Sequence, residues 1–117
     1  MGSHREQYIW KRGVKMAINC YQITQHFPTS ELYGLTSQIG RSCVSVPSNI
    51  AEGYGRTSKV EYIRFLRIAL GSLRELDTQL IIAKAVNLAK PELFNSIIQE
   101  VDELQRLIIA TIRKLEA

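Results

Sequence analysis

Polar and charged side chains recur along two segments of the chain at short intervals, including the steps of three and four residues that place them on one face of a helix. In the first segment these residues are Gln38, Arg41, Asn49 and Glu52. In the second they are Arg74, Glu75, Asp77, Thr78 and Gln79. Carboxylates held beside arginines can take up and release protons, which is the chemistry of general acid and base catalysis. An enzyme hypothesis would therefore rest on Glu52 and Glu75.

The remaining parts of a catalytic site are missing from the sequence. It contains no Ser-His-Asp order, no P-loop and no dinucleotide-binding fingerprint. Outside the first four residues the only histidine is His26, and Cys20 and Cys43 form no Cys-x-x-Cys motif, so a metal ion lacks ligands. We predict that the protein is not an enzyme and has no catalytic residues, no metal site and no cofactor. Both thiols fall on apolar stripes, and we expect them in the core.

A structural role is the alternative for the polar residues. Amides and carboxylates in a helical bundle join neighbouring helices or subunits through hydrogen bonds, and a buried charge requires a partner. We favour this interpretation, because structural ion-pair networks also perturb carboxylates. The predicted structural polar network consists of Gln38, Asn49, Glu52, Glu75 and Gln79. Within it, we expect Asn49 and Glu52 to bridge helices or subunits.

Basic residues are concentrated in the first part of the chain. The net formal charge is +4, and residues 1–67 hold nine Lys or Arg against four Asp or Glu, whereas residues 68–117 hold six against seven. Such a cluster attracts phosphate groups, although it also suits the solvated face of any soluble protein. The candidates for nucleic-acid contacts are Lys11, Arg12, Lys15, Arg41, Arg56, Lys59, Arg64 and Arg67. Tyr54 could stack on a base, whereas Tyr62 suits the core better.

The elements that must position these residues are helices. Apolar residues at steps of three and four predict helices over 5–26, 31–52 and 59–87, and a fourth that begins at Pro91. The first and fourth carry more apolar positions than one buried seam needs, which indicates contact with another subunit. The alternative for the first helix is a central place in the bundle. No alternating run predicts a strand. We expect an all-α, antiparallel up-and-down four-helix bundle that forms a homo-oligomer.

Several small residues and prolines mark bends and ends of these helices. Gly53 and Gly55 would end the second helix in the left-handed conformation that glycine accepts. Pro47 lies inside that helix, and its missing amide predicts a kink or a local break. Ser58 and the glutamate three residues later form a capping box that starts the third helix. The pair formed by Gly71 and the serine after it predicts close approach of a neighbouring helix.

The joint pattern resembles the four-helix-bundle family encoded by intervening sequences of bacterial 23S ribosomal RNA genes. The resemblance extends over most of the chain, and it is carried by Trp10, Phe27-Pro28 and the segments 34–39, 47–53, 65–66 and 69–73. One departure is Asp77, which stands where the family pattern has Glu and keeps the charge.

The resemblance implies an up-and-down bundle that assembles as a ring-like homo-oligomer, with five copies as the expected number. It implies no settled activity, although association with nucleic acid through a basic surface is the usual proposal. A related fold serves as an accessory protein to the reverse transcriptase of retroelements. We therefore expect binding of structured RNA or DNA. The alternative is a protein-interaction scaffold or an accessory factor to a polymerase, such as a retroelement reverse transcriptase.

Length and composition fit a single small domain. The chain has 117 residues, of which 45% are hydrophobic and 22% charged. No apolar run approaches the roughly 18 residues that a membrane span requires, so we expect no membrane association. Residues 1–4 have no secretion-signal character, and we interpret them as a cloning remnant. We expect one domain over residues 5–117, located in the cytoplasm.

Overall fold

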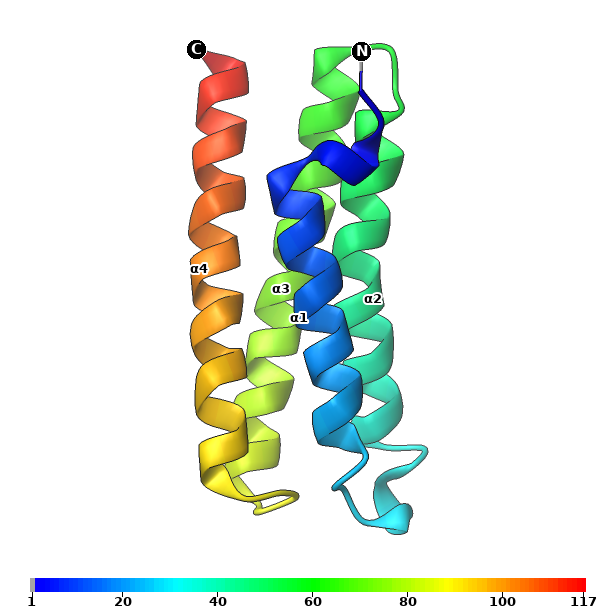
Figure 1. Cartoon of the computed structure of the whole chain (residues 1–117), viewed down its shortest axis with the longest axis vertical. Coiled ribbons are helices and arrows are strands. Elements are labelled where there is room, and N and C mark those ends of the chain that lie inside the picture. The colour runs from blue at the N-terminus through cyan, green and yellow to red at the C-terminus, as the bar shows by residue number, and fades with distance from the viewer. Residues whose placement is uncertain (1) are drawn as a thin grey trace.

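The computed structural model describes residues 2–117, which form four α-helices and two short 3-10 helices. The α-helices are α1 (Tyr8–Thr24), α2 (Leu35–Tyr54), α3 (Lys59–Ala85) and α4 (Pro91–Glu116). The 3-10 helices are η1 (His4–Glu6) and η2 (Thr29–Glu31). No strand occurs in the described residues. The helices lie side by side in an elongated bundle of 43 × 21 × 20 Å (Figure 1).

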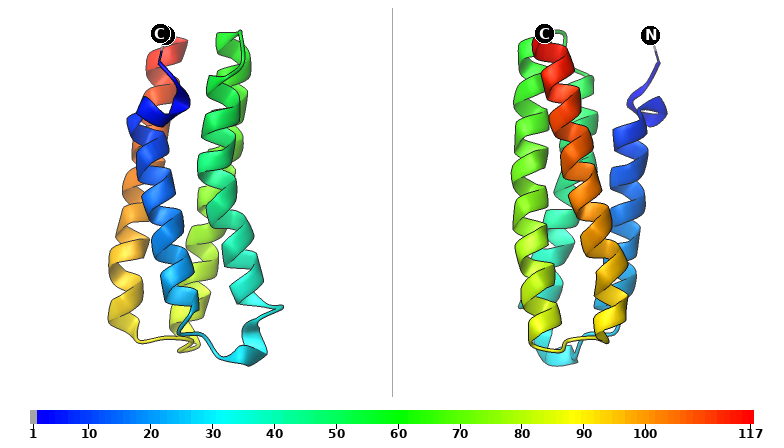
Figure 2. Two further views of the ribbon diagram at one scale, coloured as in Figure 1. Left: turned by 45° about the vertical axis from the view of Figure 1, so that its right-hand side comes forward. Right: turned by 90° about the vertical axis from the view of Figure 1, so that its left-hand side faces the viewer.

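Each helix of the bundle packs against two others. α2 contacts α1 and α3, and α4 contacts α3 and α1, which closes the bundle around one apolar core. Figure 2 shows that the chain termini and the turn between α2 and α3 lie at the same end. We call this region the terminal end of the bundle. The turns before α2 and before α4 lie at the opposite end.

The core is built from the apolar stripes that the sequence predicts. From α3 it takes Leu66, Leu73, Leu76 and Leu80, none of which is exposed to solvent. α4 contributes a matching seam from Phe94 to Ile112. Cys20 and Cys43 are free thiols in this core, as predicted. A hydrogen bond that the Cys20 thiol donates to Cys43, together with burial, raises the pKa of the Cys20 thiol, so that thiol stays protonated.

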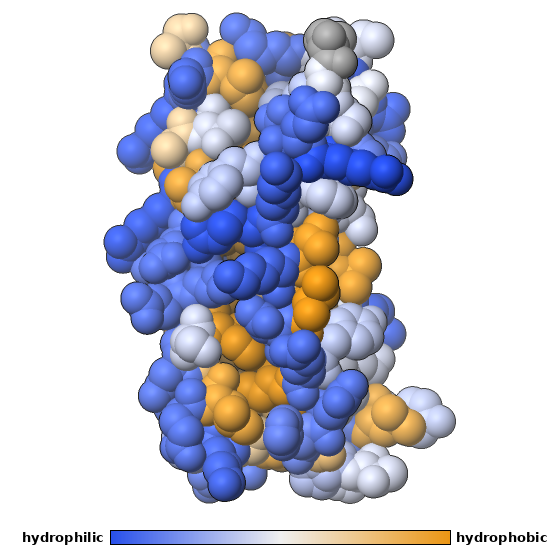
Figure 3. Space-filling view, viewed as in Figure 1, coloured by the Kyte–Doolittle hydropathy of each residue, from blue (hydrophilic) through white to orange (hydrophobic). Residues whose placement is uncertain are grey.

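Part of the apolar surface of α1 remains exposed on the single chain. Ile9, Met16 and Cys20 are buried, whereas Ile18 and Tyr21 are 53% and 54% exposed. Figure 3 shows apolar atoms emerging between hydrophilic side chains on the face where α1 and α4 lie. Helix α1 is therefore not buried on all sides, and its apolar surface exceeds what the bundle core uses.

The glycines near the end of α2 differ from the sequence prediction. No glycine in residues 2–117 has a positive φ, and Gly55 caps α2 at φ −77°. Gly53 lies inside the helix, where a Cβ atom would stand 2.5 Å from the Cβ of Phe65. The prediction of a left-handed end was wrong, because Gly55 keeps right-handed geometry and its amide still donates to the Ala51 carbonyl. Gly53 serves close packing against α3 instead. The one described residue with positive φ is Asn87, at 60°, just after α3.

Two further expectations about helix geometry are corrected. α2 continues through Pro47 without interruption, so the predicted local break is absent, while the kink stays a prediction. A Cβ atom on Gly13 of α1 would lie 3.3 Å from the proline's Cβ, so Gly13 makes room for the proline ring. Gly71 has no atom within 4 Å of its hypothetical Cβ, so the glycine of the predicted pair takes no part in a close helix contact. The contact is made by the neighbouring Ser72, whose hydroxyl lies 2.9 Å from that of Ser45.

The helix boundaries also differ at the first two helices. The predicted helices 5–26 and 31–52 are α1 and α2, which begin three and four residues later than expected. Short 3-10 turns, η1 and η2, occupy the intervening places. The predicted starts at Lys59 and Pro91 are confirmed. Ser58 caps α3 by accepting a hydrogen bond from the Glu61 amide at 3.1 Å.

Candidate functional site

The terminal end carries an aromatic and basic hollow between the α2–α3 turn, residues 2–4 and Leu115 of α4. Tyr54 and Tyr62 meet edge to face, with 5.8 Å between ring centroids. Both line a hollow of about 660 Å³ together with Arg56 and Lys59. Burial, and then the neighbouring Tyr54, raise the pKa of Tyr62, so the phenol stays protonated at neutral pH. The hollow therefore combines aromatic edges with basic side chains.

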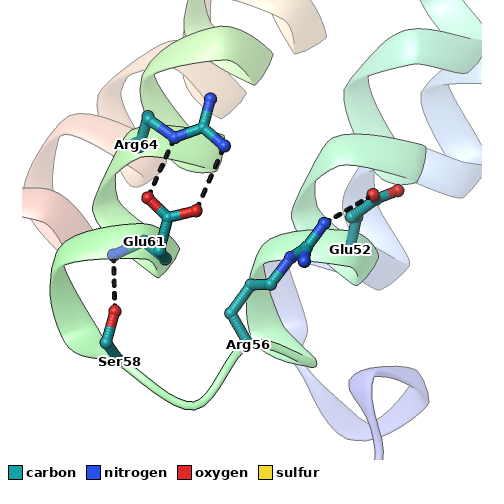
Figure 4. A network of polar contacts seen from close by, with 5 residues as sticks. All are labelled: Glu52, Arg56, Ser58, Glu61 and Arg64. Carbon is teal, nitrogen blue, oxygen red and sulfur yellow. Dashed lines mark hydrogen bonds and ion pairs between the residues drawn. The ribbon is translucent and has the colours of Figure 1, made fainter.

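Two arginines beside this hollow are held in place by carboxylates. Figure 4 shows Glu61 between Ser58 and Arg64. The Arg64 guanidinium donates two hydrogen bonds to the Glu61 carboxylate, at 3.0 and 3.1 Å, and so lowers the pKa of that carboxyl group. Arg56 donates to Glu52 at 2.9 Å. Both guanidinium groups also lie over the ring of Phe65, at 5.0 Å for Arg56 and 4.6 Å for Arg64.

Two more of the basic residues predicted to contact nucleic acid form ion pairs with α4. Arg12 donates to Glu103 at 2.9 Å and to the hydroxyl of Tyr8 at 3.0 Å, and the Tyr8 bond is the main cause of its raised pKa. Arg67 donates to Glu116 at 2.6 Å. Four of the eight predicted nucleic-acid contacts are thus already paired within the chain. The carboxylates on α4 were missed, because a pairing across 49 or 91 residues depends on the fold.

The other four basic candidates form no ion pair within residues 2–117. They are Lys11, Lys15, Arg41 and Lys59. Lys59 lies between two hollows, because it also lines a second one of about 670 Å³ with Arg64 and Arg67. Arg41 is apart from the rest, on the α2–α3 face. The structure therefore brings Arg56, Lys59, Arg64 and Arg67 together and separates Arg41 from them.

Charge is unevenly distributed along the bundle. We take the terminal end to include the neighbouring parts of the helices, which gives the segments 2–15, 52–68 and 109–117. These segments hold ten of the fifteen Lys and Arg residues but four of the eleven Asp and Glu residues. The rest of the chain has a small negative balance. The basic excess is therefore gathered at one end by the way the helices are connected.

A separate polar groove of about 480 Å³ runs between α2 and α3. Its lining consists of Gln38, Arg41, Ser42, Ser45, Ser72, Glu75 and Gln79. Two contacts cross it: the Ser42 hydroxyl donates to Glu75 at 3.1 Å, and the hydroxyls of Ser45 and Ser72 are 2.9 Å apart. We call this site the polar groove.

Three residues of the predicted structural polar network, Gln38, Glu75 and Gln79, line the polar groove, and two do not. Asn49 donates to Ser45 within its own helix, and Glu52 pairs with Arg56. Neither therefore bridges helices within the chain. Ser42 and Ser45 of α2 make the contacts with α3 instead. Both fall at helical spacing between Gln38 and Asn49, and this spacing is the sequence signal that would add them to the predicted network.

Neither a metal-binding cluster nor a membrane-spanning helix occurs in the described part of the chain. Among residues 2–117 no group of three or more His, Cys, Asp or Glu side chains is placed to hold a metal ion. None of the helices in that range is both long and apolar enough to cross a membrane.

The fold places the chain in the class of small four-helix bundles, and in this chain the bundle carries a basic end and a polar interhelical groove. A crystal structure of this class, a protein of unknown function from the S23 ribosomal protein family of Bacteroides thetaiotaomicron, superimposes with a TM-score of 0.81. It is 24% identical in sequence, and the match covers 89% of this chain and 97% of that one. At this identity the likeness establishes the fold. No curated protein matches the chain.

The sequence identifies the family directly. The family model of the 23S rRNA-intervening sequence protein matches residues 5–110. The chain therefore belongs to this family, and the resemblance noted from its motifs is confirmed.

Proposed function

We propose that this chain is a non-enzymatic protein that binds structured RNA or DNA through the terminal end of the bundle. The observation that carries the proposal is the concentration of ten Lys and Arg residues in the three segments at that end. The two tyrosines of the hollow lie among them and supply aromatic rings for unpaired bases to stack on. Such a surface would act in the cytoplasm, and it would recognise shape and phosphate charge more than sequence.

Self-assembly is the second part of the proposal. We propose that antiparallel up-and-down bundles associate into a homo-oligomeric ring, with five copies as the expected number. Exposed apolar residues include Ile18, Tyr21 and Val44 on α1 and α2, and Ile68 and Ile82 on α3. Contact between unlike surfaces generates a closed ring when the rotation closes. A ring would repeat the basic end and strengthen weak phosphate contacts through multivalency.

The test is a salt-dependent binding measurement. A fluorescent RNA hairpin and a DNA duplex of the same sequence are titrated with the protein at about 50 and 200 mM salt. We expect binding at low salt and a steep loss of affinity at high salt, because phosphate contacts release counterions. Absence of binding at low salt would refute the proposal. Capture of a protein partner that survives nuclease treatment would instead favour the scaffold alternative.

The basic end is tested by a matched pair of substitutions. Lys59→Gln removes an unpaired charge between the two hollows, and Lys90→Gln removes an exposed charge at the opposite end. We expect Lys59→Gln alone to weaken binding and to reduce the salt slope by about 1, because one lysine neutralises one phosphate. Equal effects of the two substitutions would show that net charge, and not this surface, drives binding.

A further inference from the structure

The polar groove contains an amide group whose hydrogen-bonding capacity the chain leaves unfilled. Gln79 is 7% exposed and lines the groove, and its Oε1 atom accepts no hydrogen bond from residues 2–117. A buried acceptor without a donor is destabilising, and such groups are rare in folded proteins. The oxygen is itself buried, and a donor in the groove reaches it by rotation about the terminal amide torsion of glutamine, which has a broad minimum. A donor placed there would satisfy it.

The charged groups of the groove have opposite signs. Arg41 forms no ion pair with the described residues, and the Glu75 carboxylate accepts one hydrogen bond, from Ser42 to its Oε1. A ligand with a single charge is attracted by one of these groups and repelled by the other. A ligand with both charges complements both. In the described part of the chain no aromatic or aliphatic side chain lines the groove, so it offers a nucleobase no surface on which to stack.

We infer that the polar groove binds a small zwitterion with the chemistry of a free α-amino acid. Its carboxylate pairs with Arg41, and its ammonium group donates to Glu75 and to the Gln79 carbonyl. The volume of about 480 Å³ lies in the range of small-molecule sites. This site is separate from the basic terminal end and goes beyond the proposed binding of nucleic acid.

The test is calorimetric titration of the full chain with each of the twenty L-amino acids. We expect at least one to bind with a Kd below about 1 mM. Its N-acetyl and carboxamide derivatives each lack one of the two charges, and we expect both to bind at least about tenfold more weakly, because each loses a charge-assisted hydrogen bond. The inference fails if none of the twenty binds, or if the derivatives bind as well as the parent amino acid.

Substitutions then assign the contacts. Arg41→Gln and Glu75→Gln should each weaken binding at least about tenfold. Lys90→Gln removes one positive charge outside the groove, as Arg41→Gln does within it, and should leave binding unchanged. Gln79→Leu removes the unpaired oxygen, so it should weaken binding without lowering the thermal midpoint of unfolding. This combination separates weaker ligand binding from a damaged fold.

Two outcomes of the substitutions overturn the inference. Amino-acid binding that survives both Arg41→Gln and Glu75→Gln lies elsewhere on the chain. If these substitutions change the sedimentation coefficient and leave amino-acid binding intact, the groove is a contact between copies. Titration of the same variants with the RNA hairpin keeps the two proposals apart, since nucleic-acid binding can fail while the amino acid still binds.

Discussion

Gly53 and Gly71 lie in helices of the same bundle but in opposite packing environments. A Cβ atom on Gly53 would stand 2.5 Å from the Cβ of Phe65, which is bonded to the backbone and has little freedom to move. A Cβ atom added to Gly71 would have no neighbour within 4 Å. Glycine costs helix stability at both positions, but only Gly53 gains close packing in return.

This contrast predicts opposite effects of the same substitution. Gly53→Ala should destabilise the fold by about 1–3 kcal/mol, because α2 and α3 must separate. Gly71→Ala should stabilise it by up to about 1 kcal/mol, because alanine is the better helix former. Urea unfolding followed by circular dichroism measures both. Equal effects of the two substitutions would contradict the packing at Gly53.

The roles of single residues were the least predictable part of the sequence. A glycine at the end of an apolar stripe suits a helix cap and a close helix contact equally well. The choice at Gly53 depends on Phe65, twelve positions later, and hence on the turn between α2 and α3. Glu52, which we expect to bridge helices or subunits, pairs within the chain with Arg56 four residues later, a local contact that helical spacing alone allows.

At the scale of helices, Asp77 on α3 faces a carboxylate on α4. Burial, and then the charge of Asp102, raise the pKa of Asp77. The folded state therefore keeps this proton at a pH where the unfolded chain has lost it. The stabilising contribution is complete below the unfolded pKa of about 3.9 and is lost as the pH rises through the folded pKa. At neutral pH the ionised group opposes the packing of α3 against α4.

A pH-dependent gain in stability follows for a neutral side chain at this position. Asp77→Asn should raise the thermal midpoint of unfolding at pH 7, and the difference from the parent should shrink towards pH 3. Asp77→Glu keeps the charge and serves as the control. Calorimetry at several pH values measures the effect. A difference that does not change with pH would show that the carboxylate charge is not its cause.

Helices were predicted well because their signal is local. The apolar steps of α3 and α4 extend over many turns, and Ser58 and Pro91 mark their first residues. The starts of α1 and α2 were less accurate, because η1 and η2 continue a turn-like geometry with a different hydrogen-bond pattern. The tight packing of Pro47 against Gly13 of α1 is a contact between helices, which no local pattern reveals.

For the whole molecule, the exposed apolar residues of α1 and α2 predict self-association. Tyr21→Ser should reduce the sedimentation coefficient at about 10 μM protein, because it removes apolar area from the proposed contact. Tyr33→Ser is the matched control, since Tyr33 is 93% exposed in the turn before α2. A stable monomer of the parent chain at this concentration would contradict assembly and with it the multivalency argument.

The candidate sites were predictable in their parts but not in their arrangement. The basic residues and the polar row were visible as residue types at helical spacing. Which of them meet depends on how the helices are connected, as the ion pair of Arg67 with Glu116 and the groove position of Arg41 show. The unpaired oxygen of Gln79 has no counterpart in the sequence, because it results from burial alone.

The uneven charge along the bundle has a consequence for any ring of this chain. Rotational symmetry gives every copy the same direction, so if the axis runs along the helices, all basic ends emerge on one side. The assembly would then be a disc with two different faces, one attracting polyanions and one weakly repelling them. Such a disc could cap a folded RNA on one side and leave the other side open to the solvent.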